Sequence, residues 1–371
     1  MAHAYLFVSS VILIYLCMQS YLAWWLLRNF PGLPLSRPLL GAVVVLIAVS
    51  FPLSMYWLRN SHSPLPGWFA YLSYIWLGLS LIWLTCAVSG DLLALAARLR
   101  GAAPGSRVGP AILLAGAAGL SLLALGNAAH PPRVTRLDLD LDRLPRTLEG
   151  FKIVQLSDLH LGVTVPLARF ARIAGQVNAL DPDLIVLTGD LLDPGRLDAA
   201  QAAAIGRSLK ARAGKFGVLG NHEFYHGIAA AADCYASCGA RLLRNEVAVL
   251  PEGLQIAGFD DLQAGRVGRA AIDEVLGRLD PDRPSLVLSH QPGIGDAAAA
   301  HGVGLVLSGH THAGQIFPFT LAVRAVHKYF HGLYRLGRTT LYVTSGTGQW
   351  GPPMRLFTRS EIVLITLHSP R

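Results

Sequence analysis

The stretch Ile153-Val-Gln-Leu-Ser-Asp158-Leu-His160-Leu-Gly162 places two side chains of the kind that bind metal ions directly after a short apolar run. The run before Asp158 predicts a buried β-strand. In open α/β sheets, ligands bind at the carboxyl ends of the strands, which is where Asp158 and His160 are expected to lie. An isolated Asp-x-His triplet also fits a turn carboxylate beside a surface imidazole, so the rest of the chain must decide between the two.

Four further motifs follow apolar runs of the same kind, at residues 184–187, 216–219, 286–288 and 303–307. In chain order the motifs are Gly189-Asp190-Leu-Leu-Asp193, Gly220-Asn221-His222-Glu223, Ser289-His290 and Gly309-His310-Thr-His312. Five such coincidences in one chain are improbable, so the motifs predict one shared site at the edge of an α/β sheet.

The composition separates two parts of the chain. Of 371 residues, 52% are hydrophobic and 15% are charged, which is too apolar for an ordinary soluble protein, and the apolar excess lies in the first third. The net charge of +8 is spread out without a basic block, so we expect no nucleic-acid partner. The four cysteines form no zinc-binding pattern, and the spacing of Cys234 and Cys238 disfavours a disulfide.

Apolar segments in the first third are long enough to cross the hydrocarbon core of a bilayer, which needs about 20 apolar residues. They cover residues 4–27, 39–58, 67–90 and 110–129, and they predict an all-α transmembrane domain of four helices over residues 1–130. None of these segments contains Asp, Glu, Lys or Arg, which argues against a transporter and favours a membrane anchor. A cleavable signal peptide is not expected, because no Lys or Arg precedes the first segment.

Arginines between the segments predict the orientation, because cytoplasmic loops carry an excess of Lys and Arg. The first and third loops have more of them than the second: Arg28 and Arg37, then Arg59 alone, then Arg98, Arg100 and Arg107. We therefore expect a multi-pass plasma (inner) membrane protein whose C-terminal domain is extracytoplasmic. The opposite orientation stays open, because further arginines follow the last segment: Arg133, Arg136, Arg143 and Arg146.

Residues 131–371 predict one α/β domain, because segments with strand and helix periodicity alternate along them. Residues 134–142 alternate apolar and polar side chains, as in a strand with one exposed face. Helices are expected at residues 166–179, 197–213, 233–239 and 273–279, and further strands at residues 247–250, 254–258, 341–344 and 361–367.

The candidate ligands supply carboxylate, amide and imidazole groups without thiolate, a set that suits hard or borderline divalent ions. They are Asp158, His160, Asp190, Asn221, His290, His310 and His312. Seven ligands are too many for one ion with an open position, whereas a carboxylate such as Asp190 can bridge two ions about 4 Å apart. His222 follows a candidate ligand and should point elsewhere, so it is the candidate to protonate a leaving group or to stabilise a charged transition state.

As a series, the motifs resemble the signature of the calcineurin-like metallophosphoesterase family, and residues 309–315 and 342–351 are similar to its membrane-associated bacterial branch. The resemblance implies a four-layer α/β/β/α sandwich with two divalent metal ions, expected to be Mn, Fe or Zn. The roles it implies are Asp158, His160 and His312 for one ion, Asn221, His290 and His310 for the other, Asp190 for the bridge and His222 for catalysis. Asp193 is interpreted as a residue that orients a ligand.

The family resemblance implies a membrane-anchored phosphoesterase that hydrolyses a phosphodiester, phosphomonoester or pyrophosphate bond. The anchor favours a lipid-linked substrate, and residues 317–335 mix aromatic and basic side chains, which fits an interfacial surface or a core-packed insert. Some relatives cleave UDP-diacylglucosamine, which would require a cytoplasmic domain and is disfavoured by the arginine balance. The alternative function is a non-catalytic metal-binding membrane sensor or scaffold.

Overall fold

The computed structural model describes the chain except for residues 1, 35, 61–64, 102–107, 194–196 and 371. The chain divides into two compact units. The helical unit comprises Met1–Ala129 together with two short later segments, Ile316–Pro318 and Gly351–Leu356. The sheet unit comprises His130–Gln315, Phe319–Trp350 and Phe357–Arg371.

Long apolar helices make up most of the helical unit. In the described part of the chain they are α1 (Ala2–Asn29), α2 (Arg37–Asn60), α3 (Leu65–Leu99) and α4 (Val108–Ala129). Each is long and apolar enough to cross a membrane. The four N-terminal apolar helices expected from the sequence are therefore present among the described residues.

Helix α3 does not end at residue 90, where the apolar segment was expected to stop. It continues and includes Asp91, so this helix carries a carboxylate that the expected segment lacked. Gly90 lies at a close contact with α4, where an added Cβ would come 2.2 Å from Leu113 Cδ1. Arg28 pairs with the Asp91 carboxylate, and Tyr21 donates a hydrogen bond to it at 2.7 Å, which compensates its charge.

The two short later segments pack against α3 and α4 within the helical unit. Ile316 and Met354 share a buried apolar cluster with Ile82 of α3 and Ala124 of α4. The backbone N–H of Arg355 donates to the carbonyl of Ala124 at 2.9 Å. The chain therefore joins this unit twice more after leaving its four helices.

Among the described residues, the sheet unit contains two six-stranded sheets. The first has the order β1 (Arg133–Asp140), β12 (Glu361–His368), β2 (Phe151–Leu156), β3 (Leu184–Thr188), β4 (Lys215–Val218) and β5 (Arg241–Leu242). The second has the order β10 (Gly332–Leu336), β11 (Thr339–Val343), β9 (Leu305–Ser308), β8 (Ser285–Ser289), β7 (Gln255–Phe259) and β6 (Glu246–Val249). Strands β2 to β5 are parallel, as are β7, β8, β9 and β11, so their carboxyl ends share one edge of each sheet.

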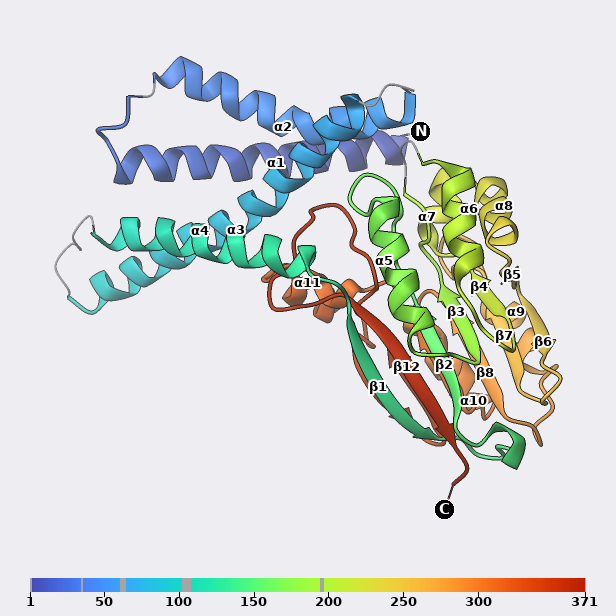
Figure 1. The fold of residues 1–371 in the computed structure, drawn as a ribbon. Coiled ribbons are helices and arrows are strands. Elements are labelled where there is room, and N and C mark those ends of the chain that lie inside the picture. The colour runs from blue at the N-terminus through green and yellow to red at the C-terminus, as the bar shows by residue number, and fades with distance from the viewer. Residues whose placement is uncertain (1, 35, 61–64, 102–107, 194–196, 371) are drawn as a thin grey trace. The chain divides into compact units, whose positions relative to one another are not determined.

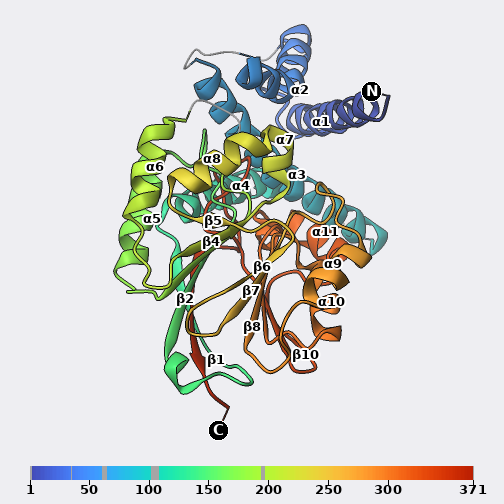
Figure 2. The same ribbon diagram turned by 90° about the vertical axis from the view of Figure 1, so that its right-hand side faces the viewer.

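The two sheets face each other, and helices cover both outer faces (Figure 1; Figure 2). Neighbouring residues of a strand point to opposite faces, so Ile153 lies in the cluster between the sheets and Val154 in the cluster under the outer helices. The covering helices are α5 (Leu167–Asn178), α6 (Ala199–Ser208) and α8 (Ile228–Ser237) on one sheet, and α9 (Arg269–Leu276) and α10 (Gly295–Ala300) on the other. The predicted four-layer α/β/β/α sandwich is confirmed.

Several elements near the motifs differ from the prediction. The helix expected over residues 197–213 is shorter, because Leu209 leaves α6 in an extended conformation and buries its side chain. The sequence did not reveal α7 (Asn221–His226), α11 (Phe319–Val326) or β10. Helices of six and eight residues make about two turns, which is too few to establish a helical period in the sequence.

Candidate metal centre

The predicted ligands come together because each follows a strand whose carboxyl end lies at the same edge of the sandwich. Strand β2 precedes Asp158 and His160, β3 precedes Asp190, β4 precedes Asn221, β8 precedes His290, and β9 precedes His310 and His312. Their side chains form two neighbouring clusters.

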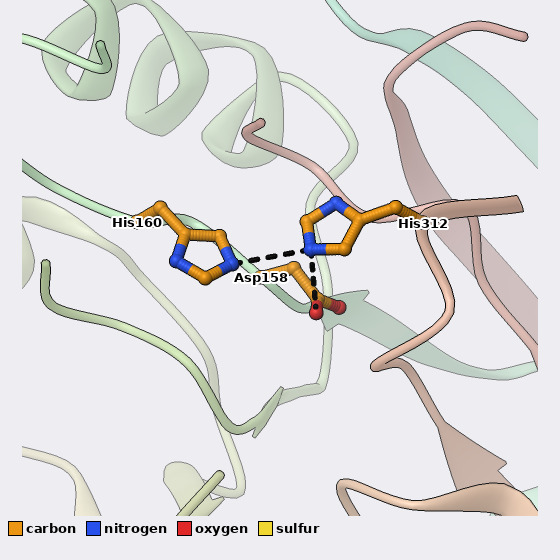
Figure 3. A group of neighbouring side chains, drawn as sticks. All are labelled: Asp158, His160 and His312. Atoms are coloured by element: carbon orange, nitrogen blue, oxygen red, sulfur yellow. Dashed lines mark hydrogen bonds and ion pairs between the residues drawn. The ribbon is translucent and has the colours of Figure 1, made fainter. Parts of the chain in front are cut away.

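The first cluster consists of Asp158, His160 and His312, whose ligand atoms lie within 4.8 Å of one another (Figure 3). Nε2 of His312 lies 3.2 Å from Nε2 of His160 and 3.3 Å from Oδ1 of Asp158. All three side chains are buried. Oxygen and imidazole donors that converge in this way are typical of a site for a borderline divalent ion.

The second cluster is centred on His290. Its Nε2 lies 3.2 Å from Oδ1 of Asn221, 3.2 Å from Oδ2 of Asp190 and 3.1 Å from Nδ1 of His310. His290 is completely buried. These side chains come from the ends of four different strands, so the cluster depends on the assembled sandwich.

Asp190 lies between the clusters. Its Oδ2 is 3.2 Å from Nε2 of His290 and 3.7 Å from Nε2 of His160. Its Oδ1 accepts a hydrogen bond from the backbone N–H of His222 at 2.9 Å, which fixes the carboxylate plane. A carboxylate in this position can contact two ions at once.

The backbone at the ligands adopts a conformation that non-glycine residues seldom take. The φ angles lie between 48° and 72° at Asp158, His160, Asp190, His310 and His312. Such strained residues collect at functional sites, where surrounding contacts hold them. Here the backbone N–H of Asp158 donates to the carbonyl of Gly189 at 3.0 Å, and that of His160 donates to the carbonyl of Asp190 at 3.0 Å.

Two motif glycines are required by close packing around the carboxylates. A Cβ on Gly220 would lie 2.2 Å from Oδ1 of Asp190. A Cβ on Gly309 would lie 2.3 Å from Oδ2 of Asp158. Any side chain at either position would displace a candidate ligand.

The hydrogen bonds of His290 test whether the donor set suits a cation. Its Nδ1 lies 2.8 Å from the carbonyl oxygen of Thr188, which can only accept, so Nδ1 carries a proton. In the neutral ring, Nε2 then presents a lone pair toward Asp190 and Asn221 oxygens, which are also acceptors. A positive charge among these atoms makes the arrangement favourable, and either a second ring proton or a divalent metal ion can supply it. The residues therefore fit a metal centre.

Shifted pKa values show the same negative potential. Burial by itself lowers the pKa of His160, but the carboxylates of Asp193, Asp190 and Asp158 outweigh burial and raise it to about 9. Burial likewise lowers the pKa of His290, and Asp190 above all raises it to about 10. Carboxylates that raise the pKa of His160 and His290 also favour a bound cation, whereas burial and the charge of His290 lower the pKa of His310 to about 3.

Asp193 connects the first cluster to His222. Its Oδ1 lies 2.8 Å from Nδ1 of His160 and 2.7 Å from Nδ1 of His222. Burial raises the pKa of Asp193, but these histidines, His160 above all, outweigh burial and hold the pKa well below its usual range. Nε2 of His222 lies 4.0 Å from Oδ2 of Asp190. Another group of side chains lies close enough together to hold a metal ion, namely His160, Asp193 and His222. In that group the Nδ1 atoms of both imidazoles face the carboxylate of Asp193.

Glu223 has a role that sequence reasoning missed. Its buried carboxylate accepts backbone N–H groups of Gly220 at 2.7 Å, Asp190 at 3.0 Å and Leu191 at 2.7 Å. Burial and the charge of Asp190 raise the pKa of Glu223 to about 7. The carboxylate ties the loop after β3 to the start of α7. A Glu in the first turn of a helix is a known capping signal, but α7 itself was not predicted.

Aromatic side chains from later in the chain border the centre. The ring centroid of His327 lies 5.3 Å from that of His310. The ring centroid of Trp350 lies 5.7 Å from that of His222, and Trp350 is half exposed. Trp350 lies in the family-like segment 342–351 and His327 in the segment 317–335, but the sequence did not assign either residue to the site.

A family model for calcineurin-like phosphoesterases matches residues 151–314. A "Transmembrane protein with metallophosphoesterase domain" from Danio rerio is 37% identical over 262 residues, which cover 67% of this chain and 60% of that protein. An "Uncharacterized metallophosphoesterase" from Aquifex aeolicus is 35% identical over 241 residues, which cover 63% of this chain and 91% of that protein. The chain belongs to the calcineurin-like metallophosphoesterase family.

The match is partial in length for some relatives. It spans 60% of the curated relatives from Danio rerio and Bos taurus. Among solved structures, a dimetal phosphatase from Danio rerio covers 59% of this chain and 99% of its own, with 13% identity and a TM-score of 0.36. All seven candidate ligands lie inside the region that the family model matches.

Proposed function

We propose that this metallophosphoesterase is a membrane-anchored hydrolase that cleaves a phosphoester bond with two divalent metal ions. The observation that supports this most is the Asp190 carboxylate, which lies between two donor clusters with His222 beside it. Mn, Fe and Zn all suit mixed oxygen and imidazole donors. The bond is a phosphodiester, phosphomonoester or pyrophosphate, and the four apolar helices favour a lipid-linked substrate.

The ligand assignment follows the two clusters. Asp158, His160 and His312 would hold one ion, Asn221, His290 and His310 the other, and Asp190 would contact both. When bound, a pair of such ions lowers the pKa of a water molecule and neutralises charge on a phosphoryl group. The side chains keep their donor atoms aimed at the centre because Asp193 fixes the ring of His160 and the carbonyl of Thr188 fixes the ring of His290.

His222 is proposed to deliver a proton to the leaving group. Its Nδ1 lies 2.7 Å from a carboxylate oxygen of Asp193, so a protonated ring would form an ion pair there. In the imidazolium form, Nε2 carries a second proton on the side nearer Asp190. Transfer of that proton to a leaving oxygen returns His222 to the neutral ring, still held by Asp193.

Hydrolysis by the purified full chain tests this function. With Mn²⁺, Fe²⁺ or Zn²⁺ added, the chain should hydrolyse an aryl phosphodiester or an aryl phosphomonoester, and Asp190→Asn should serve as the inactive control. A chain that binds metal but hydrolyses neither compound would contradict the proposal and favour a metal-binding sensor or scaffold.

The proposed location is the plasma (inner) membrane with the sheet unit outside the cytoplasm. The support is the larger number of arginines in the first and third loops between the apolar helices. A reporter that is active only outside the cytoplasm should give a signal when fused after residue 371. A signal only from a cytoplasmic reporter at that position would reverse the orientation.

A further inference from the structure

Helix α11 exposes an apolar face. Its five most exposed apolar side chains are Phe319, Leu321, Ala322, Ala325 and Val326. At about 100° per residue these fall on one side of the helix, whereas the half-buried Thr320 and Val323 fall on the other. A surface helix of a soluble protein shows the reverse arrangement, with its apolar side buried. The exposed face of α11 is therefore built for an apolar medium.

The position of α11 is fixed beside the metal centre. A Cβ on Gly314 would lie 2.3 Å from Cα of Thr320, so the helix packs directly on the turn that carries the ligand His312. The residue that follows α11 is His327, whose ring lies 5.3 Å from that of His310. Both ends of the helix lie near candidate ligands, and its apolar side chains are exposed.

Chain continuity indicates what the apolar face meets. Helix α11 begins one residue after Pro318, which belongs to the helical unit with its four candidate membrane spans. Where the chain leaves and rejoins the sheet unit nearby, aromatic side chains are exposed: 52% at Phe319, 48% at Trp350 and 68% at Phe357. Aromatic rings gather at the headgroup level of bilayers. The apolar medium that the sequence connects to α11 is therefore a lipid bilayer.

Basic side chains accompany the apolar face. Arg324 is exposed on α11 and makes no ion pair with any residue that the structure describes. Lys328 follows the helix, exposed, and pairs with Asp296. An apolar helix face flanked by cationic side chains suits the surface of a bilayer that contains anionic phospholipids.

We propose that α11 lies in the headgroup region of the bilayer and holds the metal centre at the membrane surface, where the substrate is the phosphoester of a membrane lipid. The placement of α11 at the bilayer rests on its exposed face and on the chain connections alone. The substrate class rests in addition on the proposed function.

A fluorescent label tests the docking without any measure of activity. Val326→Cys would be labelled in a chain whose native cysteines are replaced by Ala, and reconstituted in vesicles of phosphatidylethanolamine and phosphatidylglycerol. The native cysteines are Cys17, Cys86, Cys234 and Cys238. The matched control is Val249→Cys, because Val249 is also an exposed apolar residue of the sheet unit but lies on β6.

Lipids that carry a nitroxide should quench the label at Val326 several-fold more than the label at Val249, and aqueous iodide should do the opposite. Equal access of iodide to both labels would overturn the docking. Protection of Val326 from both quenchers would overturn it as well, because a protein surface, such as a second copy of this chain, would then cover the helix.

A charged pair of substitutions tests the substrate class. The double variant Leu321→Glu, Val326→Glu should lose about tenfold or more of its rate on phosphatidic acid or phosphatidylglycerol in vesicles, because charge opposes insertion of the helix. Its rate on a soluble aryl phosphoester should stay within about twofold, and Val249→Glu should match the unsubstituted chain on both substrates.

The outcomes separate the two proposals. Equal loss on both substrates would make α11 a support of the metal centre and overturn its role at the lipid surface. An unsubstituted chain that hydrolyses the aryl compound but neither lipid would overturn the substrate class and leave the proposed function intact. A chain that binds metal and hydrolyses nothing would overturn the proposed function, while the label at Val326 would still decide the docking.

Discussion

The two donor clusters hold their central histidines by different means. In the first, Nδ1 of His160 faces the carboxylate of Asp193, whereas in the second, Nδ1 of His290 faces the backbone carbonyl of Thr188. Both distances are 2.8 Å. Asp193 also faces His222, so a single side chain connects the first cluster to the candidate proton donor. We infer that the first cluster couples metal binding to proton transfer and that the second serves binding.

The largest effect is expected where the clusters meet. Asp190→Asn should lose both metal ions and reduce hydrolysis to the blank rate, because one carboxylate serves the two clusters. Metal analysis and activity on an aryl phosphodiester measure this together. Retention of one ion at full affinity with most of the activity would show that the clusters are independent.

Removal of the proton donor should separate catalysis from metal binding. His222→Ala should keep its metal and lose roughly 10²- to 10⁴-fold in turnover, as expected for a lost general acid. The loss should shrink for leaving groups that are already stable anions, such as nitrophenolate, because they need little protonation. Metal loss with equal damage for all leaving groups would instead make His222 a support of the first cluster.

A milder change should affect the first cluster alone. Asp193→Asn keeps the size of the side chain but removes the charge that faces His160 and His222, so activity should fall by about 10- to 100-fold. Affinity for the ion of the first cluster should weaken, while the ion at His290 stays. Equal weakening of both ions, measured by metal titration, would break the distinction between the clusters.

A buried carboxylate outside the clusters provides the control with the smallest effect on activity. Glu361 is completely buried and accepts hydrogen bonds from Thr135, Thr344 and the backbone of Ser345. Burial raises its pKa, but hydrogen bonds with His331, Thr135 and Ser345 outweigh burial and lower it to about 2. Glu361→Gln should leave metal content and turnover nearly unchanged.

The effect of Glu361→Gln should appear in stability at low pH. A carboxylate whose pKa is lowered on folding stabilises the protein above its unfolded pKa, and the contribution disappears as pH falls toward the folded pKa. Here the contribution is about 3 kcal/mol, present above pH 4.5 and lost toward pH 2. Denaturant unfolding should show a steeper loss of stability between these pH values in the unsubstituted chain than in the variant. Equal slopes would contradict this.

Much of the centre could be predicted because its ligands follow buried strands directly. Asp158 comes two residues after β2 and His290 comes directly after β8, and parallel strands bring such residues to one edge. The alternation of strand and helix segments predicted an α/β domain, whereas its four-layer arrangement was implied by the family resemblance. Only the position of the ligands follows from local sequence and the geometry of a strand.

Other features depend on contacts between distant segments. Glu223 supports the loop after β3 through the backbone N–H groups of Asp190 and Leu191, and backbone groups leave no sequence pattern. The apolar face of α11 points outward because Thr320 packs on Gly314. The composition of residues 317–335 could not decide between an interfacial surface and a core-packed insert. Helix α3 continues to Leu99, past the end of the apolar segment that the sequence indicated at residue 90.

Anomalous diffraction from crystals of the metal-loaded chain tests the central claim most directly. It should show two peaks, one at Asp158, His160 and His312 and one at Asn221, His290 and His310, with the Asp190 carboxylate between them. A single peak, or a peak held by His160, Asp193 and His222, would contradict the account.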